Sequence, residues 1–276
     1  MTLNRVVKLA VWMAMLLLLL VVIFPFYWMV NTSLKPMSEV FKSPPALYPS
    51  TLSFAGYVNI WATRLMGRFF LNSTIISVGS TLLAMALSAL AAYGFSRFRL
   101  RWEQPLILIL LFTQMLPGTL LIIPYFQLMA KLRLINSYLS LILAYVSFAL
   151  PFSTWMLVGF FRSIPLELDE AAMVDGCTRV SAFWRVILPL SVPGLVAVGI
   201  FTFLLAWNAY VFALVLTTDP KMFPLSVGIA NMLGEYQVAW NEMMAGAVLA
   251  TLPVFILYGF LERYLVQGIT AGAIKG

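Results

Sequence analysis

Histidine is absent from the sequence, cysteine occurs once, and only 10% of the residues are charged. Without histidine, the chain lacks the commonest general base and the commonest metal ligand of proteins. A single cysteine, Cys177, excludes an internal disulfide. The sequence has no Gly-x-x-x-x-Gly-Lys-Ser/Thr phosphate loop, no Gly-x-Ser-x-Gly motif and no cluster of metal-ligating residues. We therefore predict that the chain is not an enzyme and has neither a catalytic site nor a metal site. The same absences argue against ATP binding through a phosphate loop.

The shortage of charge also indicates the class of protein. Soluble domains typically contain about 25% charged residues, whereas this 276-residue chain is 62% hydrophobic and has a mean hydropathy of +0.97. Its long apolar runs are typical of membrane-spanning helices and not of the alternating strands of a barrel. We therefore predict an all-α fold: a polytopic membrane protein with six transmembrane helices, forming a single domain over residues 1–276.

Six apolar runs reach the length of about 20 residues that a membrane-spanning helix needs. The predicted spans are residues 8–30, 69–93, 104–128, 137–161, 188–217 and 243–261. The first follows Arg5 and Lys8, as a secretory signal would, but its apolar stretch is too long for a signal core and no small-x-small cleavage site follows. We predict that it is retained as a helix. Prolines recur in or near the spans, which predicts kinked packing, with hinges as the alternative.

The distribution of basic residues predicts the orientation of the chain, because cytoplasmic loops carry an excess of lysine and arginine. The two termini and the loops that follow the second and fourth spans hold ten of the 17 basic residues, and the remaining segments hold seven. The densest group is Arg97, Arg99 and Arg101. We therefore predict that both termini and the loop at about 162–188 are cytoplasmic, and that the loop at about 31–68 is external.

The middle of each predicted span contains no Asp, Glu, Lys, Arg or His. Carriers driven by a proton or sodium gradient usually need ionisable groups or equivalent coordination inside the membrane. The sequence therefore disfavours an ion-coupled secondary carrier, which we keep as the alternative hypothesis. If the chain takes part in active transport, a partner must supply the energy.

Uncharged polar side chains do occur within the spans, at Asn72, Ser73, Gln114, Ser147, Asn208 and Tyr210. Such groups either form hydrogen bonds between helices or line a polar path through the membrane. Sugars offer hydroxyl groups to amides and apolar ring faces to aromatic side chains. We therefore predict Asn208, Tyr210 and Gln114 as candidates for a solute path, with interhelical hydrogen bonding as the alternative.

The loop at about 162–188, called here the charged loop, is too polar for a membrane. Four of the ten acidic residues fall within nine positions of it: Glu167, Asp169, Glu170 and Asp175. Pro165 and the acids after it favour the start of a helix, Gly176 can adopt the left-handed conformation that ends one, and Ser181 can cap a second. We predict a compact helix-turn-helix that offers a docking surface to a soluble partner.

The pattern Glu170-Ala171-Ala172-x-x-Asp175-Gly176, followed by Phe183, Ile187 and Leu188-Pro189, resembles the cytoplasmic loop of permease subunits of ATP-binding-cassette (ABC) importers. Further motifs are similar to the carbohydrate-uptake branch, the maltose-type permease pairs: Thr32-Ser-Leu-Lys35, Asn72-Ser73, Ala91-Ala-Tyr-Gly94 and Ala206-Trp-Asn208. The tail from Gly268 to Gly276 resembles the ending of the second permease in such pairs. Two positions depart from the pattern: Ala209 replaces a frequent acid, and Cys177 replaces an alanine.

This resemblance implies the type I ABC importer transmembrane fold and import of a sugar or oligosaccharide. Permeases for glycerol phosphate or a polyol are the alternative within the family, although the spans contain no cation for a phosphate. The implied residues for coupling to the ATPase are Glu170, Ala171, Ala172, Asp175 and Gly176. The implied partners are a second homologous permease, two copies of a cytoplasmic ATP-binding subunit, an external solute-binding protein, the sugar and membrane lipids, without nucleic acid. The resemblance also implies a bacterial or archaeal inner membrane and no cofactor in this chain, since the ATPase subunits bind the ATP.

Overall fold

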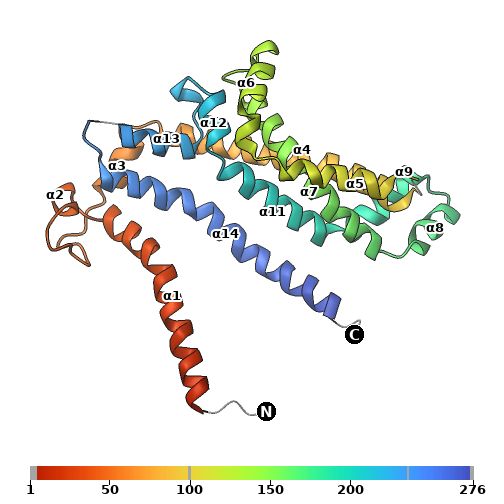
Figure 1. Ribbon diagram of the computed structural model, residues 1–276, viewed down its shortest axis with the longest axis horizontal. Coiled ribbons are helices and arrows are strands. Elements are labelled where there is room, and N and C mark those ends of the chain that lie inside the picture. The colour runs from red at the N-terminus through yellow and green to blue at the C-terminus, as the bar shows by residue number, and fades with distance from the viewer. Residues whose placement is uncertain (1–4, 99–100, 235, 274–276) are drawn as a thin grey trace. The chain divides into compact units, whose positions relative to one another are not determined.

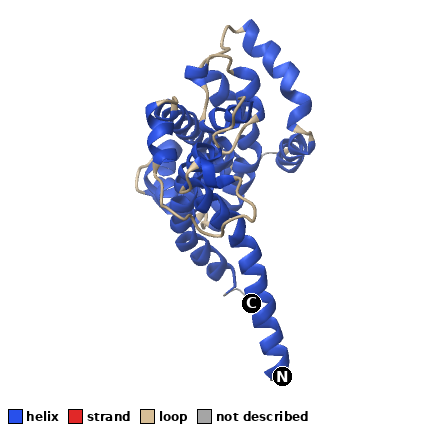
Figure 2. Cartoon of the chain, turned by 90° about the vertical axis from the view of Figure 1, so that its left-hand side faces the viewer, coloured by secondary structure: helices blue, strands red, loops and turns tan. Residues whose placement is uncertain are grey.

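The computed structural model describes residues 5–98, 101–234 and 236–273 of the 276-residue chain. Throughout these residues every regular element is a helix and none is a strand (Figures 1 and 2). The predicted all-α class is therefore confirmed. The helices form two compact units, of which the first comprises Met1–Gly67 and Gly228–Leu252, and the second comprises Arg68–Val227 and Pro253–Gly276. The extent of a single domain over residues 1–276 stays a prediction.

The first unit contains α1 (Arg5–Ser33), α2 (Met37–Val40), α3 (Ala55–Ala62), η5 (Met232–Gly234) and the first part of α14 (Trp240–Ala273). The predicted first span lies inside α1, whose most apolar stretch is 0% buried within the chain. A helix that is apolar on all sides must be covered by lipid or by another protein. This helix is therefore consistent with a membrane span.

Polar contacts fold the predicted external loop of the first unit. The buried Lys35 donates from Nζ to the carbonyl oxygen of Ala46 at 2.5 Å, and its ammonium lies 4.9 Å from the centre of the Trp28 ring. Glu39 of α2 accepts hydrogen bonds from both the backbone N–H and the hydroxyl of Ser50. These contacts satisfy two charged side chains that would otherwise be costly to bury.

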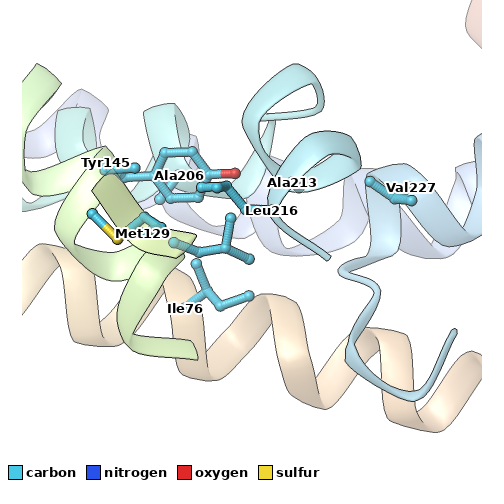
Figure 3. Close-up of a cluster of buried hydrophobic side chains, with 9 residues drawn as sticks. Ile76, Met129, Tyr145, Ala206, Ala213, Leu216 and Val227 are labelled. Atoms are coloured by element: carbon cyan, nitrogen blue, oxygen red, sulfur yellow. The ribbon is translucent and has the colours of Figure 1, made fainter. Parts of the chain in front are cut away.

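The second unit contains α4 (Met66–Arg97, from Arg68 onward), α5 (Glu103–Phe112), η1 (Thr113–Met115), η2 (Gly118–Leu121), α6 (Ile122–Lys131), α7 (Tyr138–Ser163), α8 (Glu167–Val174), α9 (Arg179–Ala182), η3 (Phe183–Ile187), α10 (Leu188–Leu190), α11 (Val192–Trp207), α12 (Val211–Leu216), η4 (Pro220–Met222) and the start of α13 (Leu225–Asn231). One core cluster includes Ile76 of α4, Met129 of α6, Tyr145 of α7 and Leu216 of α12 (Figure 3).

A second core cluster fixes the charged loop to the long helices. Phe161 of α7, Phe183 and Ile187 of η3 and Val198 of α11 are all buried in it. At the start of α11, Gly194 allows the Phe160 ring to approach so closely that a Cβ on residue 194 would lie 2.7 Å from it. The part of the chain that follows the charged loop is therefore tightly packed.

Two of the six predicted spans are broken. Four helices are long and apolar enough to cross a membrane, and the number reaches six if each of two bent helix pairs forms one span. The predicted span 104–128 bends by 89° between Met115 and Gly118. Leu116 is extended there, with ψ of 123°, because the ring of the following proline disfavours the helical conformation.

The predicted span over residues 188–217 is not one straight helix. The segments Arg179–Leu190 and Val192–Trp207 meet at an angle of 77°. The chain then leaves the helix again at Asn208 and resumes it only at Val211. Pro189 in α10 and Pro193 at the start of α11 cannot donate the hydrogen bonds of a continuous helix, so a break in this region has a local cause.

Candidate functional site

The charged loop begins with the short helix that the sequence predicts. The first turn of α8 contains Glu167, Asp169 and Glu170, so three carboxylates lie at the positive end of the helix dipole. Gly176 follows the helix with φ of +87°, and the N–H of Cys177 donates to the carbonyl of Ala172 at 2.9 Å. The left-handed glycine therefore closes the helix, as the sequence predicts.

The cap of the second helix was predicted at the wrong residue. Thr178, and not Ser181, is the N-cap of α9, and its hydroxyl accepts a hydrogen bond from the backbone N–H of Ser181 at 3.2 Å. Thr178 is extended, with ψ of 162°, as is typical of an N-cap residue, so α9 starts at Arg179, before Ser181. The second helix of the charged loop therefore begins three residues after Gly176, at Arg179.

The residues predicted for ATPase coupling divide between the surface and the interior. Glu170, Ala171, Asp175 and Gly176 are exposed, whereas Ala172 is only 7% exposed. Across the described residues, neither Glu170 nor Asp175 belongs to an ion pair. Both carboxylates are thus available to basic groups of another protein, while Ala172 packs inside the loop.

Asp169 differs from the neighbouring acids because its carboxylate is buried and paired. Its Oδ2 atom lies 2.7 Å from Nε of Arg97, the last residue of α4. Arg97 also donates from Nη2 to the carbonyl of Ile164 at 3.1 Å. The sequence analysis did not predict this pair, because it considered Arg97 only as a basic residue that indicates orientation and Asp169 only as one of four acids in the charged loop.

The solute-path candidate Gln114 lies at the break between α5 and α6. Its side chain is exposed and donates from Nε2 to the carbonyl of Phe148 at 3.1 Å. The Phe148 ring contacts Tyr125 and Phe212, with centroid distances of 5.7 Å and 5.0 Å. Gln114 therefore adjoins a group of three aromatic rings from α6, α7 and α12.

Asn208 and Tyr210 lie together at the break between α11 and α12. Asn208 is exposed and donates from Nδ2 to the carbonyl of Leu204 in α11, at 2.9 Å, and the exposed Tyr210 immediately precedes α12. The hydroxyl of Ser226 donates to the carbonyl of Ala209 at 2.7 Å and holds this break in place. Non-helical backbone at membrane depth is tolerated where protein or a water-filled cavity surrounds it.

Other polar residues within the spans have structural partners. The fully buried Asn72 donates to the carbonyls of Lys221 and Phe223, each at 2.9 Å, and accepts from the hydroxyl of Tyr138 at 2.8 Å. Ser73 accepts a hydrogen bond from the N–H of Leu225 at 2.7 Å. Asn72 and Ser73 therefore form hydrogen bonds between segments, which was the alternative to a role in lining a polar path. Among the described residues, no group of three or more His, Cys, Asp or Glu side chains could hold a metal.

Known proteins resemble this chain over almost its whole length. The sulfoquinovosyl glycerol transport system permease protein of Agrobacterium fabrum is 36% identical, covering 92% of this chain and 89% of that protein. The trehalose/maltose transport system permease protein of Thermococcus litoralis is also 36% identical, covering 95% and 94%. In structure, the chain is similar to a bacterial ABC transporter involved in the import of the acidic polysaccharide alginate, with a TM-score of 0.84 over 94% of this chain and 96% of that one, at 21% identity.

The family comparison covers both breaks and the entire charged loop. Residues 84–271 match the model of the binding-protein-dependent transport system inner membrane component. The members named above are transport permeases and not enzymes. This chain therefore belongs to the family of inner membrane components of binding-protein-dependent transport systems, the permease subunits of ABC importers.

Proposed function

We propose that this permease carries a sugar or oligosaccharide into the cytoplasm, driven by a separate ATPase that docks on the charged loop. The proposal is carried by two exposed carboxylates, those of Glu170 and Asp175, which have no ion-pair partner among the described residues and lie beside the left-handed Gly176 in a chain of this family. Exposed charges are suited to contact with a soluble partner, and Ala171 adds no bulk that would keep a partner away from the helix. Ala172 supports the same surface from inside the loop.

The proposed assembly has a second homologous permease, two copies of the ATP-binding subunit and an external solute-binding protein. The sequence contains no Gly-x-x-x-x-Gly-Lys-Ser/Thr phosphate loop for ATP. In the proposed assembly the ATPase subunits therefore bind the nucleotide, and this subunit carries no cofactor. The proposed location is the inner membrane of a bacterial or archaeal cell, with both termini and the charged loop in the cytoplasm. The excess of basic residues in those segments supports this orientation.

Sugar is the proposed solute because the relatives described above are named for transport of trehalose/maltose and of sulfoquinovosyl glycerol. Within this chain, the proposed path residues are Asn208, Tyr210 and Gln114. Amide and phenol groups suit the hydroxyls of a sugar, and the aromatic rings beside Gln114 suit its apolar ring faces.

Binding measurements on the external solute-binding protein test the proposed solute directly. We expect tight binding of one or a few members of a panel of mono-, di- and oligosaccharides, and the same sugar should enter vesicles that contain the complete transporter with ATP inside. Binding confined to glycerol phosphate or a simple polyol would assign the permease to the alternative branch. Uptake driven by a proton or sodium gradient without the ATPase would instead support a secondary carrier.

A further inference from the structure

The buried contact between Arg97 and Asp169 connects two elements that are distant in the sequence. The Arg97 side chain is 4% exposed and the Asp169 side chain 10% exposed, with 2.7 Å between Nε and Oδ2. A charge in such a position is tolerated when it is paired and hydrogen bonded. The pair joins the end of α4 to the first turn of α8.

Further polar contacts surround this pair. Arg97 donates to the carbonyl of Ile164, the residue at which α7 ends. One turn earlier in α4, the hydroxyl of Tyr93 lies 3.3 Å from Oδ1 of Asp169 and 3.1 Å from the carbonyl oxygen of Arg179, the first residue of α9. The end of α4 is thus bonded to the residues on both sides of α8 as well as to α8 itself.

The contact also adjoins the proposed docking surface. Arg97, Asp169 and Glu170 line one cavity of about 160 Å³ at the charged loop. Glu170 is exposed, whereas Asp169 is buried one position earlier in the same helical turn. The two acids therefore suit different roles. The exposed Glu170 is accessible to a partner protein, and the buried Asp169 connects α8 to α4.

The covalent connections of α8 lead to α7 and α9, and not to α4. A displacement imposed on α8 consequently reaches α4 only through non-covalent contacts. Apolar packing joins α4 to η3, where Ala89 and Ala92 share a cluster with Phe183. Apolar contacts are non-directional. The ion pair is instead accompanied by hydrogen bonds to its two charged groups, from Tyr93 to Asp169 and from Arg97 to the carbonyl of Ile164, and such charge-assisted hydrogen bonds are directional.

We propose that Arg97 and Asp169 are positioning residues that lock α8 to the end of α4, with Tyr93 in support, so that both move as one rigid body when the ATPase acts. The inference rests on the proposed function, because it requires an ATPase on α8. It goes further by stating which membrane helix receives the motion directly and through which side chains. Rigid-body movement of packed elements is a common route by which a local displacement spreads.

The test measures the distance between α8 and α4 in the complete transporter and needs no knowledge of the solute. Spin labels are attached to cysteines introduced at Val174 of α8 and Leu90 of α4, which are 87% and 55% exposed, in a Cys177→Ser background. Pulsed electron paramagnetic resonance then gives the distance distribution without nucleotide and with ATP plus vanadate. For the otherwise unchanged chain, we expect a narrow distribution with the same centre in both states.

Asp169→Asn and Arg97→Met should both broaden this distribution and make its centre shift with nucleotide. Asp169→Asn keeps the volume of the side chain, so it gives a result even if Arg97→Met fails to assemble. The double variant Arg97→Asp with Asp169→Arg reverses the charges and should narrow the distribution again. Arg101→Met is the matched control, because Arg101 is an exposed arginine close to the same helix end, and it should leave the distribution unchanged.

The outcomes separate this inference from the proposed function. If the ATPase binds the labelled wild-type permease and both single variants keep its narrow, nucleotide-independent distribution, the lock between α8 and α4 is overturned while the docking role of the loop stands. If Arg101→Met broadens the distribution as much as Arg97→Met, the specific role of the pair is also overturned. If the ATPase does not bind the wild-type chain, the proposed function fails, and the coupling role of the pair fails with it.

Discussion

Single residues determine the shape of the charged loop, and Gly176 provides the first prediction at this scale. Its φ of +87° is rarely adopted by other residues, and among the described atoms nothing lies within 4 Å of a Cβ built there. Gly176→Ala should therefore destabilise the loop only through its backbone, by about 1 kcal/mol. Gly176→Pro should be far worse, because proline fixes φ near about −65° and removes the N–H that donates to Met173.

Affinity purification of the permease with its ATPase measures this difference. We expect Gly176→Ala to retain most of the ATPase and Gly176→Pro to lose it, while both variants still reach the membrane. Charge reversal at Glu170 should also release the ATPase, since its carboxylate is exposed without an ion-pair partner in the described part of the chain. Wild-type ATPase retention and wild-type uptake in the proline and charge-reversal variants would remove the loop from the mechanism.

Glu39 provides a pH-dependent prediction for the external loop. Hydrogen bonds from the hydroxyl and the N–H of Ser50 hold the pKa of Glu39 below its ordinary value of 4.5. Because the pKa is lowered in the folded loop, the charged form contributes stability above pH 4.5, and this contribution disappears as the pH falls through the lowered pKa. The loop should therefore loosen in acid and remain firm at neutral pH.

Hydrogen exchange of the backbone across residues 36–53 gives the measurement. The exchange rate should rise as the pH falls below the ordinary glutamate value, after correction for the intrinsic pH dependence of exchange. Glu39→Gln should remove most of that acid-induced change, whereas Glu167→Gln, a change at an exposed acid of α8, should leave it intact. An identical acid response in Glu39→Gln would show that other groups hold the loop.

At the scale of elements, the sequence predicts helices well and their breaks poorly. The length and hydropathy of the apolar runs are local properties, so α1, α4, α7 and α14 lie close to their predicted positions. Breaks depend on how a bent chain is packed by its neighbours, as at Asn208, where Ser226 holds the carbonyl of Ala209 from a later element. Hydropathy carries no signal of that tertiary contact.

The candidate site shows the same division between local and distant causes. The acidic first turn of α8 and the glycine after it are readable from neighbouring residues, and both are present. The burial of Asp169 beside exposed Glu170 depends on Arg97, which arrives from another helix. No pattern within the loop itself indicates that Asp169 is buried while Glu170 is exposed.

The break after α11 carries a prediction about the solute path. Among the described residues, the side-chain amide of Asn208 donates only to Leu204 in the preceding turn, so Asn208→Ala should leave the packing and the binding of the ATPase unchanged. If the residue lines the path, the same variant should reduce uptake. A cysteine at position 208 in a Cys177→Ser background should react with a small water-soluble thiol reagent in at least one state of the transport cycle.

A cysteine at Thr202 is the matched control for that experiment, because Thr202 lies in the same helix and is 0% exposed. It should stay unreactive in every state. A cysteine at position 208 that is equally unreactive throughout the cycle would identify Asn208 as a packing residue. Its polar side chain would then be satisfied by protein neighbours alone.

At the scale of the whole molecule, the chain is built to work with other proteins. The apolar stretch of α1 is 0% buried within this chain, and Glu170 and Asp175, the proposed docking acids, have no ion-pair partner among the described residues. Membrane helices gain little from burial of apolar surface against each other, so their association relies on close packing and polar contacts. A second permease in the membrane and an ATPase on the charged loop would cover these two different kinds of surface.

The last prediction is that the chain does no transport work alone. Its sequence has neither a phosphate loop for ATP nor an ionisable residue in the middle of a predicted span. In liposomes that contain only this chain, none of the sugars in the binding panel should accumulate, with or without a proton or sodium gradient. Adding the second permease, the ATPase and the binding protein, with ATP on the side of the ATPase, should start accumulation of the bound sugar. Gradient-driven accumulation by the purified chain would contradict the prediction, because a chain that depends on its partners for energy cannot concentrate a solute without them.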